Sequence, residues 1–546
     1  MYAILFPSCR ASSPGTLIKE GPFAMRKLLA LILAAGMALS ISALPALAED
    51  YDPNATIYLT SISDPVSCDP ALASDGASGM VVDRVFSALV RFNPDGSVYP
   101  EIAESFEISD DGLVYTFKIR EGITFHDGTV CDASAVKWNF DRQIGDAATP
   151  DMPYAKSFFG PIVSCEAPDD YTVVITLDAP NSAFIVYNAM RIGMGIASPT
   201  AWEADPEGFA RNPVGSGPYK FEEWVSDQYV SMVAFDDYIL GRPSNGRVIV
   251  RFIKEAATRT SELLTGTIDA MGDISTDVLP VIEASDNINL IRNPGRNISY
   301  LAFADYETNA LFSDIRLRQA VAYALDIDAI NYGLFGENMI TPGSMIPPTM
   351  QGGDREFTII GYDPDKAVEL MTEAGYPDGF KFTMLAYTVI RGYNPVGERL
   401  AVQIMSELDK IGIKVDIIIK PWADFLNAMY METPDYDAIL GGWGAATNDT
   451  SYMLQLLEGS NRGTGANHSG YNNPEFDALI AAAKAATDYD TAADLFAQAA
   501  QLANEDVPVV LLGHGVDMAA ISKKIINGTE WYGRWGFQED HFQKVN

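Results

Sequence analysis

Residues that could perform covalent or acid–base chemistry are few in this sequence and poorly spaced for catalysis. The nearest approach to a G-x-S-x-G nucleophile turn is Gly215-Ser216-Gly217, which does not match its spacing and is preceded by Pro213 rather than by a glycine. His126 lies close to Cys131, but packing in a turn explains this spacing better than a thiol–imidazole pair. No G-x-x-x-x-G-K-[ST] phosphate loop and no H-E-x-x-H motif occurs. The sequence therefore predicts no catalytic residue and no enzymatic activity.

Acidic residues dominate the composition. The chain has 73 Asp and Glu against 37 Lys and Arg, a formal net charge of −36. Such a charge repels phosphate backbones and anionic lipid headgroups, which disfavours nucleic acid and membrane surfaces as partners. Carboxylates are too abundant to single out one acid–base pair. The 4 histidines are scattered and no Cys or His pair has zinc spacing, so we expect no metal and no cofactor.

The N-terminus resembles an export signal. Arg26-Lys27 precede an uncharged apolar run over residues 28–48 that ends in Ala-Leu-Ala. A basic pair, an apolar stretch and a small-x-small end predict a signal peptide at residues 1–48, with Met25 as the initiator and residues 1–24 as a mis-assigned start. A single membrane anchor is the alternative, because the run is long enough to span a bilayer. We expect a soluble exported protein.

Three cysteines remain after this processing: Cys68, Cys131 and Cys165. An oxidising compartment favours one disulfide and one free thiol. We expect the bridge between Cys131 and Cys165, because both lie in one strand-rich segment. Three buried, unpaired thiols are the alternative.

Hydrophobic periodicity predicts a mixed α/β fold. Residues 56–60 resemble a strand and the apolar positions of 81–89 follow a helical spacing, while residues 114–119 and 171–177 alternate as strands do.

Helices with clear boundaries follow. Asp363-Pro364 and Asn473-Pro474 each predict a helix start, and Gly375 the end of the first of these helices. A helical pattern at 400–408 precedes what we expect to be a buried strand at 413–419. This alternation predicts βα units with a mostly parallel sheet.

Six stretches of the sequence, in order, carry a family resemblance. They are Glu101 to Gly128, Pro213 to Tyr219, Asp314 to Ala320, Tyr362 to Pro377, Tyr436 to Gly444, and Tyr471 to Pro474. Together they resemble the family 5 extracellular solute-binding proteins, the dipeptide, oligopeptide and nickel receptors of ABC importers. One such match is weak, but six in the expected order over nearly the whole mature chain are specific.

The resemblance implies a two-lobed periplasmic binding-protein clamp, type II-like, with an additional β-rich domain. The implied segments are 49–90, 213–300 and 516–546 for lobe I, 91–212 for the extra domain, and 301–515 for lobe II. It also implies a monomeric periplasmic protein that captures a peptide or peptide-like solute with a carboxylate between its lobes and delivers it to a permease. The rival function is a secreted enzyme or chaperone-like peptide handler on the same scaffold.

The resemblance also implies where a ligand carboxylate binds. Dipeptide receptors of the family use an arginine in an Arg-x-Tyr-Asn-Pro segment, and here Arg391 and Tyr393 belong to such a segment. A guanidinium forms a bidentate, charge-assisted pair with a carboxylate, which fits this role. A salt bridge to a neighbouring acid is the alternative role for Arg391.

The other end of the ligand matches the family less well. Gly442, Trp443 and Gly444 fit its Gly-Trp loop, in which a tryptophan stacks on the ligand and glycines allow close approach. Ala446 stands where peptide receptors place an aspartate for the α-ammonium, and Asp449 comes three residues later.

This departure favours a blocked or modified ligand, such as a glutathione-like or murein-derived peptide or an opine. The nickel branch is disfavoured, because the histidine that the resemblance implies for this loop is missing. The resemblance adds Ser74 and Asp75, in an early loop, to the expected ligand-binding residues.

Overall fold

The computed structural model describes residues 52–545, apart from 95, 276, 390, 430–434, 446–448, 463–466 and 534–535. The predicted signal peptide at 1–48 and the predicted site residue Ala446 lie outside these residues. Within the described part of the chain, no helix is both long and apolar enough to cross a membrane.

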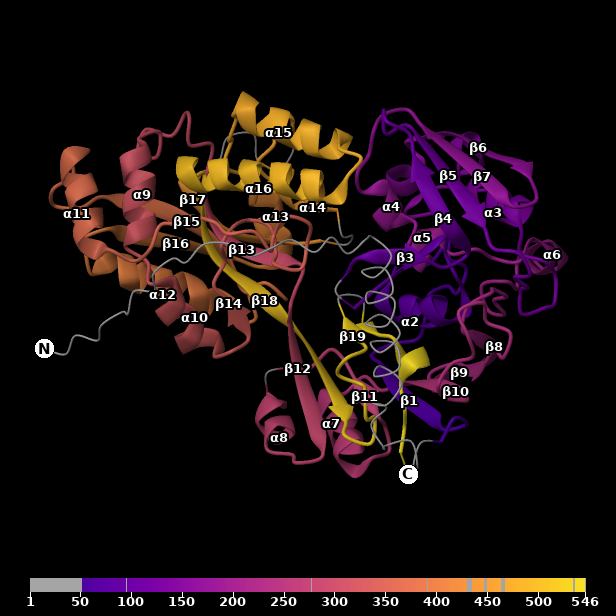
Figure 1. The fold of residues 1–546 in the computed structure, drawn as a ribbon. Helices are drawn as coiled ribbons and strands as arrows, with labels where there is room; N and C mark the ends of the chain where they lie inside the picture. The colour runs from indigo at the N-terminus through magenta and orange to yellow at the C-terminus, as the bar shows by residue number, and fades with distance from the viewer. Residues whose placement is uncertain are drawn as a thin grey trace, which may run out of the picture. The chain divides into compact units, whose positions relative to one another are not determined.

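A four-stranded sheet opens the described chain (Figure 1). Its order is β1 (Thr56–Ser61), β10 (Arg247–Phe252), β9 (Tyr229–Ala234) and β8 (Tyr219–Val225), with β1 parallel to β10 and the other pairs antiparallel. The strand predicted at 56–60 is therefore confirmed. Its first neighbour in the sheet comes from nearly 200 residues later in the sequence, so the sheet joins two distant segments.

The first helix, α2, spans Gly76–Val85 and starts earlier than the apolar pattern predicted. Asp75 caps it: its side chain accepts a hydrogen bond from the Ser78 amide at 3.0 Å, which satisfies an otherwise unpaired N–H of the first turn. Val81, Val82 and Val85 are fully buried, while Phe86 is the C-terminal cap in extended conformation.

A separate antiparallel sheet follows in the order β4 (Ala103–Ile108), β5 (Val114–Ile119), β7 (Thr172–Leu177) and β6 (Ile162–Asp169). The strands predicted at 114–119 and 171–177 are confirmed as β5 and β7. Their alternate residues are buried, as expected for a sheet with one face toward a core.

The predicted Cys131–Cys165 disulfide is not present. Cys131, Cys165 and Cys68 are separate buried thiols. Cys165 pairs in register with Ile175, and Cys131 donates its amide to the Ile123 carbonyl at 2.9 Å. Burial raises the pKa of the Cys165 and Cys68 thiols to about 12 and that of Cys131 as well. Since the thiolate is the form that reacts, these thiols stay protonated and inert in the folded core.

The largest sheet has eight strands and is built around the 14-residue strand β18 (Val509–Ser522). Its path runs β11 (Ala270–Met271), β18, β13 (Asn297–Phe303), β17 (Ala438–Gly444), β15 (Lys381–Tyr387) and β16 (Lys414–Lys420), with β12 (Ile288–Pro294) and β14 (Met339–Ile340) also pairing with β18. The first half of β18 pairs with β13 and the second half with β12. One continuous strand therefore connects two groups of strands.

The expectation of a mostly parallel sheet is wrong here. β15 is parallel to β16 and β17, but β13 is antiparallel to both β17 and β18. The alternation of strands and helices in residues 364–444 does produce parallel strands. β13 and β18 come from outside that segment, and their pairs are antiparallel. β16 is also not buried: it pairs with β15 alone, and Ile419 is 41% exposed at this edge.

Helices cover both faces of the parallel part. Phe382 and Met384 of β15 belong to a core with α9 (Ile315–Tyr323), α11 (Pro364–Glu373) and α12 (Glu398–Asp409). The alternate residues Leu385 and Tyr387 belong to the opposite core, with α13 (Trp422–Met429), α14 (Thr450–Leu454), α15 (Pro474–Ala485) and α16 (Tyr489–Asp506). Successive side chains of a strand point to opposite faces of the sheet, so alternate residues of β15 belong to different cores.

The predicted helix boundaries are confirmed where caps define them. Asp363 accepts from the Lys366 amide at 2.9 Å and Pro364 is the first residue of α11, while Gly375 adopts φ 92° just past its end. Asn473 caps α15, which begins at Pro474.

The remaining elements are short or peripheral. The strands are β2 (Val90–Phe92), β3 (Val98–Pro100), β19 (Tyr532–Gly533) and β20 (Gly536–Phe537). The helices are α3 (Ala133–Asp141), α4 (Phe184–Tyr187), α5 (Arg191–Met194), α6 (Pro199–Ala204), α7 (Ala256–Thr265), α8 (Leu279–Glu283) and α10 (Ile327–Phe335).

Candidate functional site

Arg391 lies in the loop between β15 and α12, and a buried asparagine holds this loop in place. Arg391 and Asn394 exchange two backbone hydrogen bonds of 3.0 and 2.9 Å. The Asn394 side chain is fully buried and donates to the Tyr387 hydroxyl at 3.2 Å and to the Gly397 carbonyl at 3.0 Å. The Arg-x-Tyr-Asn segment is thus a fixed turn that determines where the arginine side chain starts.

The Arg391 guanidinium stacks on an aromatic ring and not on a carboxylate. Its central carbon lies 3.6 Å from the centre of the Trp422 ring. Its Nε is buried and has no hydrogen-bond partner, and the guanidinium forms no ion pair with any carboxylate of the described residues. The geometry disfavours the salt-bridge alternative.

The glycines of β17 bring two tyrosine rings against the backbone. A Cβ added at Gly442 would overlap the Tyr393 ring, and one added at Gly441 would lie 2.8 Å from the Tyr300 ring. Any larger residue would therefore have to displace a ring. The predicted residues Tyr393 and Gly442 are in direct contact, although they are far apart in the sequence.

Tyr393, Gly442, Trp443 and Gly444 line one cavity of about 180 Å³, which we call the aromatic chamber. Its remaining walls are aromatic or apolar apart from one glycine and one histidine: Tyr300, Tyr387, Trp422, Phe425, Leu426, Met429, Gly441, Tyr452 and His468. Trp422 stacks on Phe425 at 5.3 Å between ring centres, and Tyr387 meets both rings edge-on.

The polar groups in the chamber wall carry no charge. The Trp443 indole Nε1 is buried and has no hydrogen-bond partner among the described residues. Burial lowers the pKa of His468 to about 4, so its imidazole is neutral at physiological pH. Burial also raises the pKa of Tyr393. The chamber itself is therefore uncharged, and the Arg391 guanidinium, which stacks on Trp422 but does not line the chamber, is a positive charge next to it.

Asp449 is engaged in structural hydrogen bonds. It caps α14 by accepting from the Ser451 amide at 2.8 Å, and its other carboxylate oxygen accepts from the Tyr187 hydroxyl at 2.6 Å. Burial and the neighbouring carboxylate raise the pKa of Tyr187. Asp449 therefore links α14 to a tyrosine of α4, and its predicted role in ligand binding stays a prediction.

Ser74 and Asp75 line a different and larger cavity, of about 760 Å³. Asp75 is the cap of α2 described above and also accepts from the Ser78 hydroxyl at 2.5 Å. Gly392 lines this larger cavity, while its neighbour Tyr393 lines the aromatic chamber. The Arg391 loop is therefore the boundary that the two cavities share.

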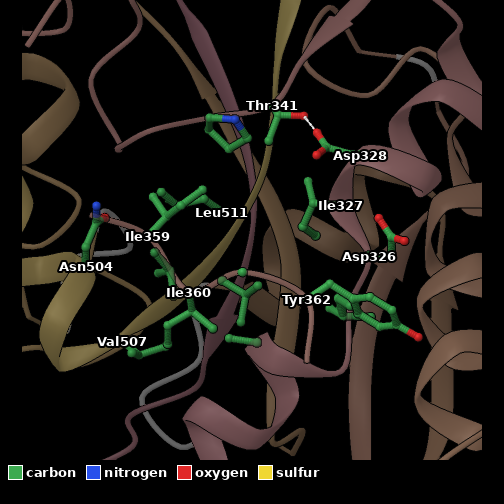
Figure 2. Close-up of a pocket in the computed structure, with 16 residues that line it drawn as sticks. Asp326, Ile327, Asp328, Thr341, Ile359, Ile360, Tyr362, Asn504, Val507 and Leu511 are labelled. Atoms are coloured by element: carbon green, nitrogen blue, oxygen red, sulfur yellow. Dashed lines mark hydrogen bonds between the residues drawn. The ribbon is translucent and has the colours of Figure 1, made fainter. Parts of the chain in front are cut away.

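A further cavity, of about 110 Å³, contains none of the predicted site residues (Figure 2). Ile327, Ile359 and Leu511 form apolar walls, and Asp328 accepts a hydrogen bond from Thr341 at the edge. The described residues also hold no cluster of three His, Cys, Asp or Glu side chains that could bind a metal ion.

The sequence did not reveal the α13 wall of the chamber. Trp422, Phe425, Leu426 and Met429 recur at the i, i+3, i+4, i+7 spacing of an amphipathic helix. That signal was available, but it is the same for a helix that packs on a core and for one that lines a cavity. The partial exposure of Trp422, Leu426 and Met429 separates the two cases.

Comparison with known proteins shows to which family this chain belongs. The family model described as bacterial extracellular solute-binding proteins, family 5 middle, matches residues 97–465. The chain belongs to this family. The match includes the Arg391 loop, the Gly-Trp strand and α13. The resemblance of the six sequence stretches is therefore confirmed.

Relatives of this solute-binding protein align along most of its length. The heme-binding protein A of Haemophilus influenzae is 31% identical over 86% of this chain and 89% of the relative. The dipeptide-binding protein of Escherichia coli is 26% identical over 86% of this chain and 91% of the relative. The structure of HbpA2 from Haemophilus parasuis superposes with a TM-score of 0.82 at 26% identity, covering 90% of this chain and all of that one. The chain thus has the two-lobed α/β fold class that the sequence predicted.

Proposed function

We propose that this protein is the substrate-binding component of an ABC importer and that it captures a carboxylate-bearing peptide or peptide-like solute at Arg391. The observation that supports this proposal is the Arg391 guanidinium, which stacks on Trp422 and has no carboxylate partner among the described residues. Arg391 itself lines neither cavity, but the next two residues of its loop, Gly392 and Tyr393, each line one of them. A bound carboxylate would give the guanidinium the ion pair that no described residue provides.

The names of the relatives fit a carboxylate ligand. One is named for heme and the other for dipeptides, and both of these molecules carry carboxylate groups. A strongly acidic protein repels such groups at long range, so a local cation has to select and hold them. Arg391 is the residue that we propose for this task, with Tyr393 and Trp443 beside it.

The proposal includes the remaining expectations for this chain. The protein is exported by the signal peptide at 1–48, acts as a monomer in the periplasm and returns its ligand chemically unchanged to a permease. The change of partner along β18, from β13 up to Gly513 to β12 from Val516 on, supports a lobe boundary at this place. Segments 49–90, 213–300 and 516–546 form one lobe, 301–515 the other, and 91–212 the extra domain.

Native mass spectrometry tests the ligand assignment. The processed protein is purified without refolding as wild type, Arg391→Ala and Arg399→Ala. Arg399 is an exposed arginine of α12 and serves as the matched control. We expect a small molecule with a carboxylate on the wild type and on Arg399→Ala, with its mass unchanged after prolonged incubation, and none on Arg391→Ala.

If the wild-type protein is purified without a bound ligand, a thermal-shift series with dipeptides, glutathione and an opine identifies one. Calorimetry then compares the affinities of the three proteins for this ligand. We then expect Arg391→Ala to weaken binding by about a hundredfold, as for a lost charge-assisted pair. A ligand that stays bound to Arg391→Ala with wild-type affinity would show that Arg391 is structural.

A further inference from the structure

The aromatic chamber adjoins the Arg391 guanidinium through a shared wall. Trp422 contacts the guanidinium at 3.6 Å and also lines the chamber, and Tyr393 lines it from the same loop as Arg391. A carboxylate paired with Arg391 would therefore place the neighbouring group of the ligand within reach of the chamber. This step rests on the proposed function, because it takes Arg391 as the carboxylate anchor.

The size and surface of the chamber suit one ring. Its volume is about 180 Å³, and an apolar cavity of about 150 Å³ is enough to hold a benzene ring. Phe425, Leu426 and Met429 supply apolar surface, and the aromatic rings offer edges and faces for stacking. A charged group would lose its hydration in a chamber that contains no opposite charge.

The polar groups of the chamber wall add no charge to it. The Trp443 indole nitrogen is buried so completely that a ligand atom in the chamber cannot reach it, and the His468 imidazole is neutral. The chamber therefore recognises a ligand group by its shape and apolar contacts.

We infer that the aromatic chamber is a specificity pocket for the side group next to the ligand carboxylate, and that it selects a ring-bearing apolar group. For a peptide, this means a C-terminal residue such as tyrosine or phenylalanine and not alanine or lysine. The pocket rather than the arginine sets the preference among carboxylate ligands.

The test uses three N-acetylated dipeptides that share one carboxylate end: acetyl-Ala-Ala, acetyl-Ala-Phe and acetyl-Ala-Tyr. Calorimetry on the wild type should show that the Phe peptide binds at least about tenfold more tightly than the Ala peptide, since a buried aromatic side chain adds that much. The Tyr peptide carries a ring of nearly the same size and should share this advantage.

Two variants test this inference. Leu426→Trp fills the chamber and should abolish the advantage of the Phe peptide while binding of the Ala peptide is kept. Asn427→Trp adds the same residue at an exposed position of the same helix and should change neither.

The outcomes distinguish this inference from the proposed function. If the Ala and Phe peptides bind the wild type equally, the specificity pocket is wrong and the carboxylate site stands. If Leu426→Trp keeps the full preference for the Phe peptide, the ring binds elsewhere and the inference is also overturned. If none of the three peptides binds at millimolar concentration, the inference falls together with the peptide form of the proposed function.

Discussion

Arginines have opposite surroundings in two regions of this molecule. In a buried ion network near the C-terminus, Arg84 pairs with Glu539 at 2.6 Å, Arg91 with Asp540 at 2.7 Å and Arg191 with Glu101 at 2.7 Å. These six side chains are at most 10% exposed. At the aromatic chamber, Arg391 has an aromatic ring as its partner and no described carboxylate.

The difference separates charges that are paired within the fold from a charge that is held without a counter-charge among the described residues. A buried ion pair completes itself within the fold, and removing one partner leaves the other charge uncompensated. An arginine that is held by stacking keeps its hydrogen-bond donors free for a ligand. The network also joins α2, β2 and the C-terminal segment, so it connects parts of the chain that are far apart in sequence.

The largest effect should come from breaking the network. Glu101 is fully buried and accepts from Arg191 at 2.7 Å, from the Tyr238 hydroxyl at 2.6 Å and from the Ala88 amide at 3.0 Å. Glu101→Gln should lower the free energy of unfolding by about 3–5 kcal/mol, because Arg191 loses its counter-charge. Urea unfolding measures this, with the exposed Glu104→Gln as control.

Arg391→Ala completes this comparison in the same assay. Only a stacking contact is lost, so the free energy of unfolding should fall by less than about 1 kcal/mol. A loss as large as that of Glu101→Gln would remove the distinction between the two regions.

An intermediate effect on the free energy of unfolding is expected for Tyr187→Phe. This substitution tests whether Asp449 acts in the fold or in the ligand site. The substitution removes one hydrogen bond to a carboxylate, at 2.6 Å, and leaves the ring in place. The free energy of unfolding should fall by about 1.5 kcal/mol, and ligand affinity should stay unchanged. The fully comparable change at an exposed site is Tyr332→Phe, which should have no effect. A tenfold loss of affinity at unchanged stability would instead assign Asp449 to the ligand site.

The smallest effect is the one expected from pH at the chamber. Burial holds the pKa of His468 at about 4, below its ordinary value of 6.5, so the fold favours the neutral ring. Stability from this group is present above pH 6.5 and is lost as the pH falls toward 4, when the unfolded chain binds the proton first. Ligand affinity should therefore be constant between pH 5.5 and 8 by calorimetry. A fall in affinity centred near pH 6.5 that disappears in His468→Gln would show a solvated, titrating histidine.

The sequence by itself determined much of the local structure and the family. Caps such as Asp363 and Asn473 fix helix starts because a side-chain oxygen satisfies the first free N–H groups, and this needs only neighbouring residues. Alternation in residues 114–119 fixed a strand for the same local reason. The site residues Arg391, Tyr393 and Trp443 also came from the sequence, through the resemblance of their segments.

The tertiary structure alone decided what these residues face. The directions of the strands in the largest sheet depended on where β13 and β18 enter it. The Cys131 and Cys165 thiols stayed separate, and Asp449 met Tyr187, which lies 262 residues away in the sequence. The apolar stripe of α13 has one pattern whether it meets a core or a cavity. Whether Arg391 finds a carboxylate or Trp422 likewise depends on long-range packing, because partners are set by distance in space and a linear pattern carries no such distance.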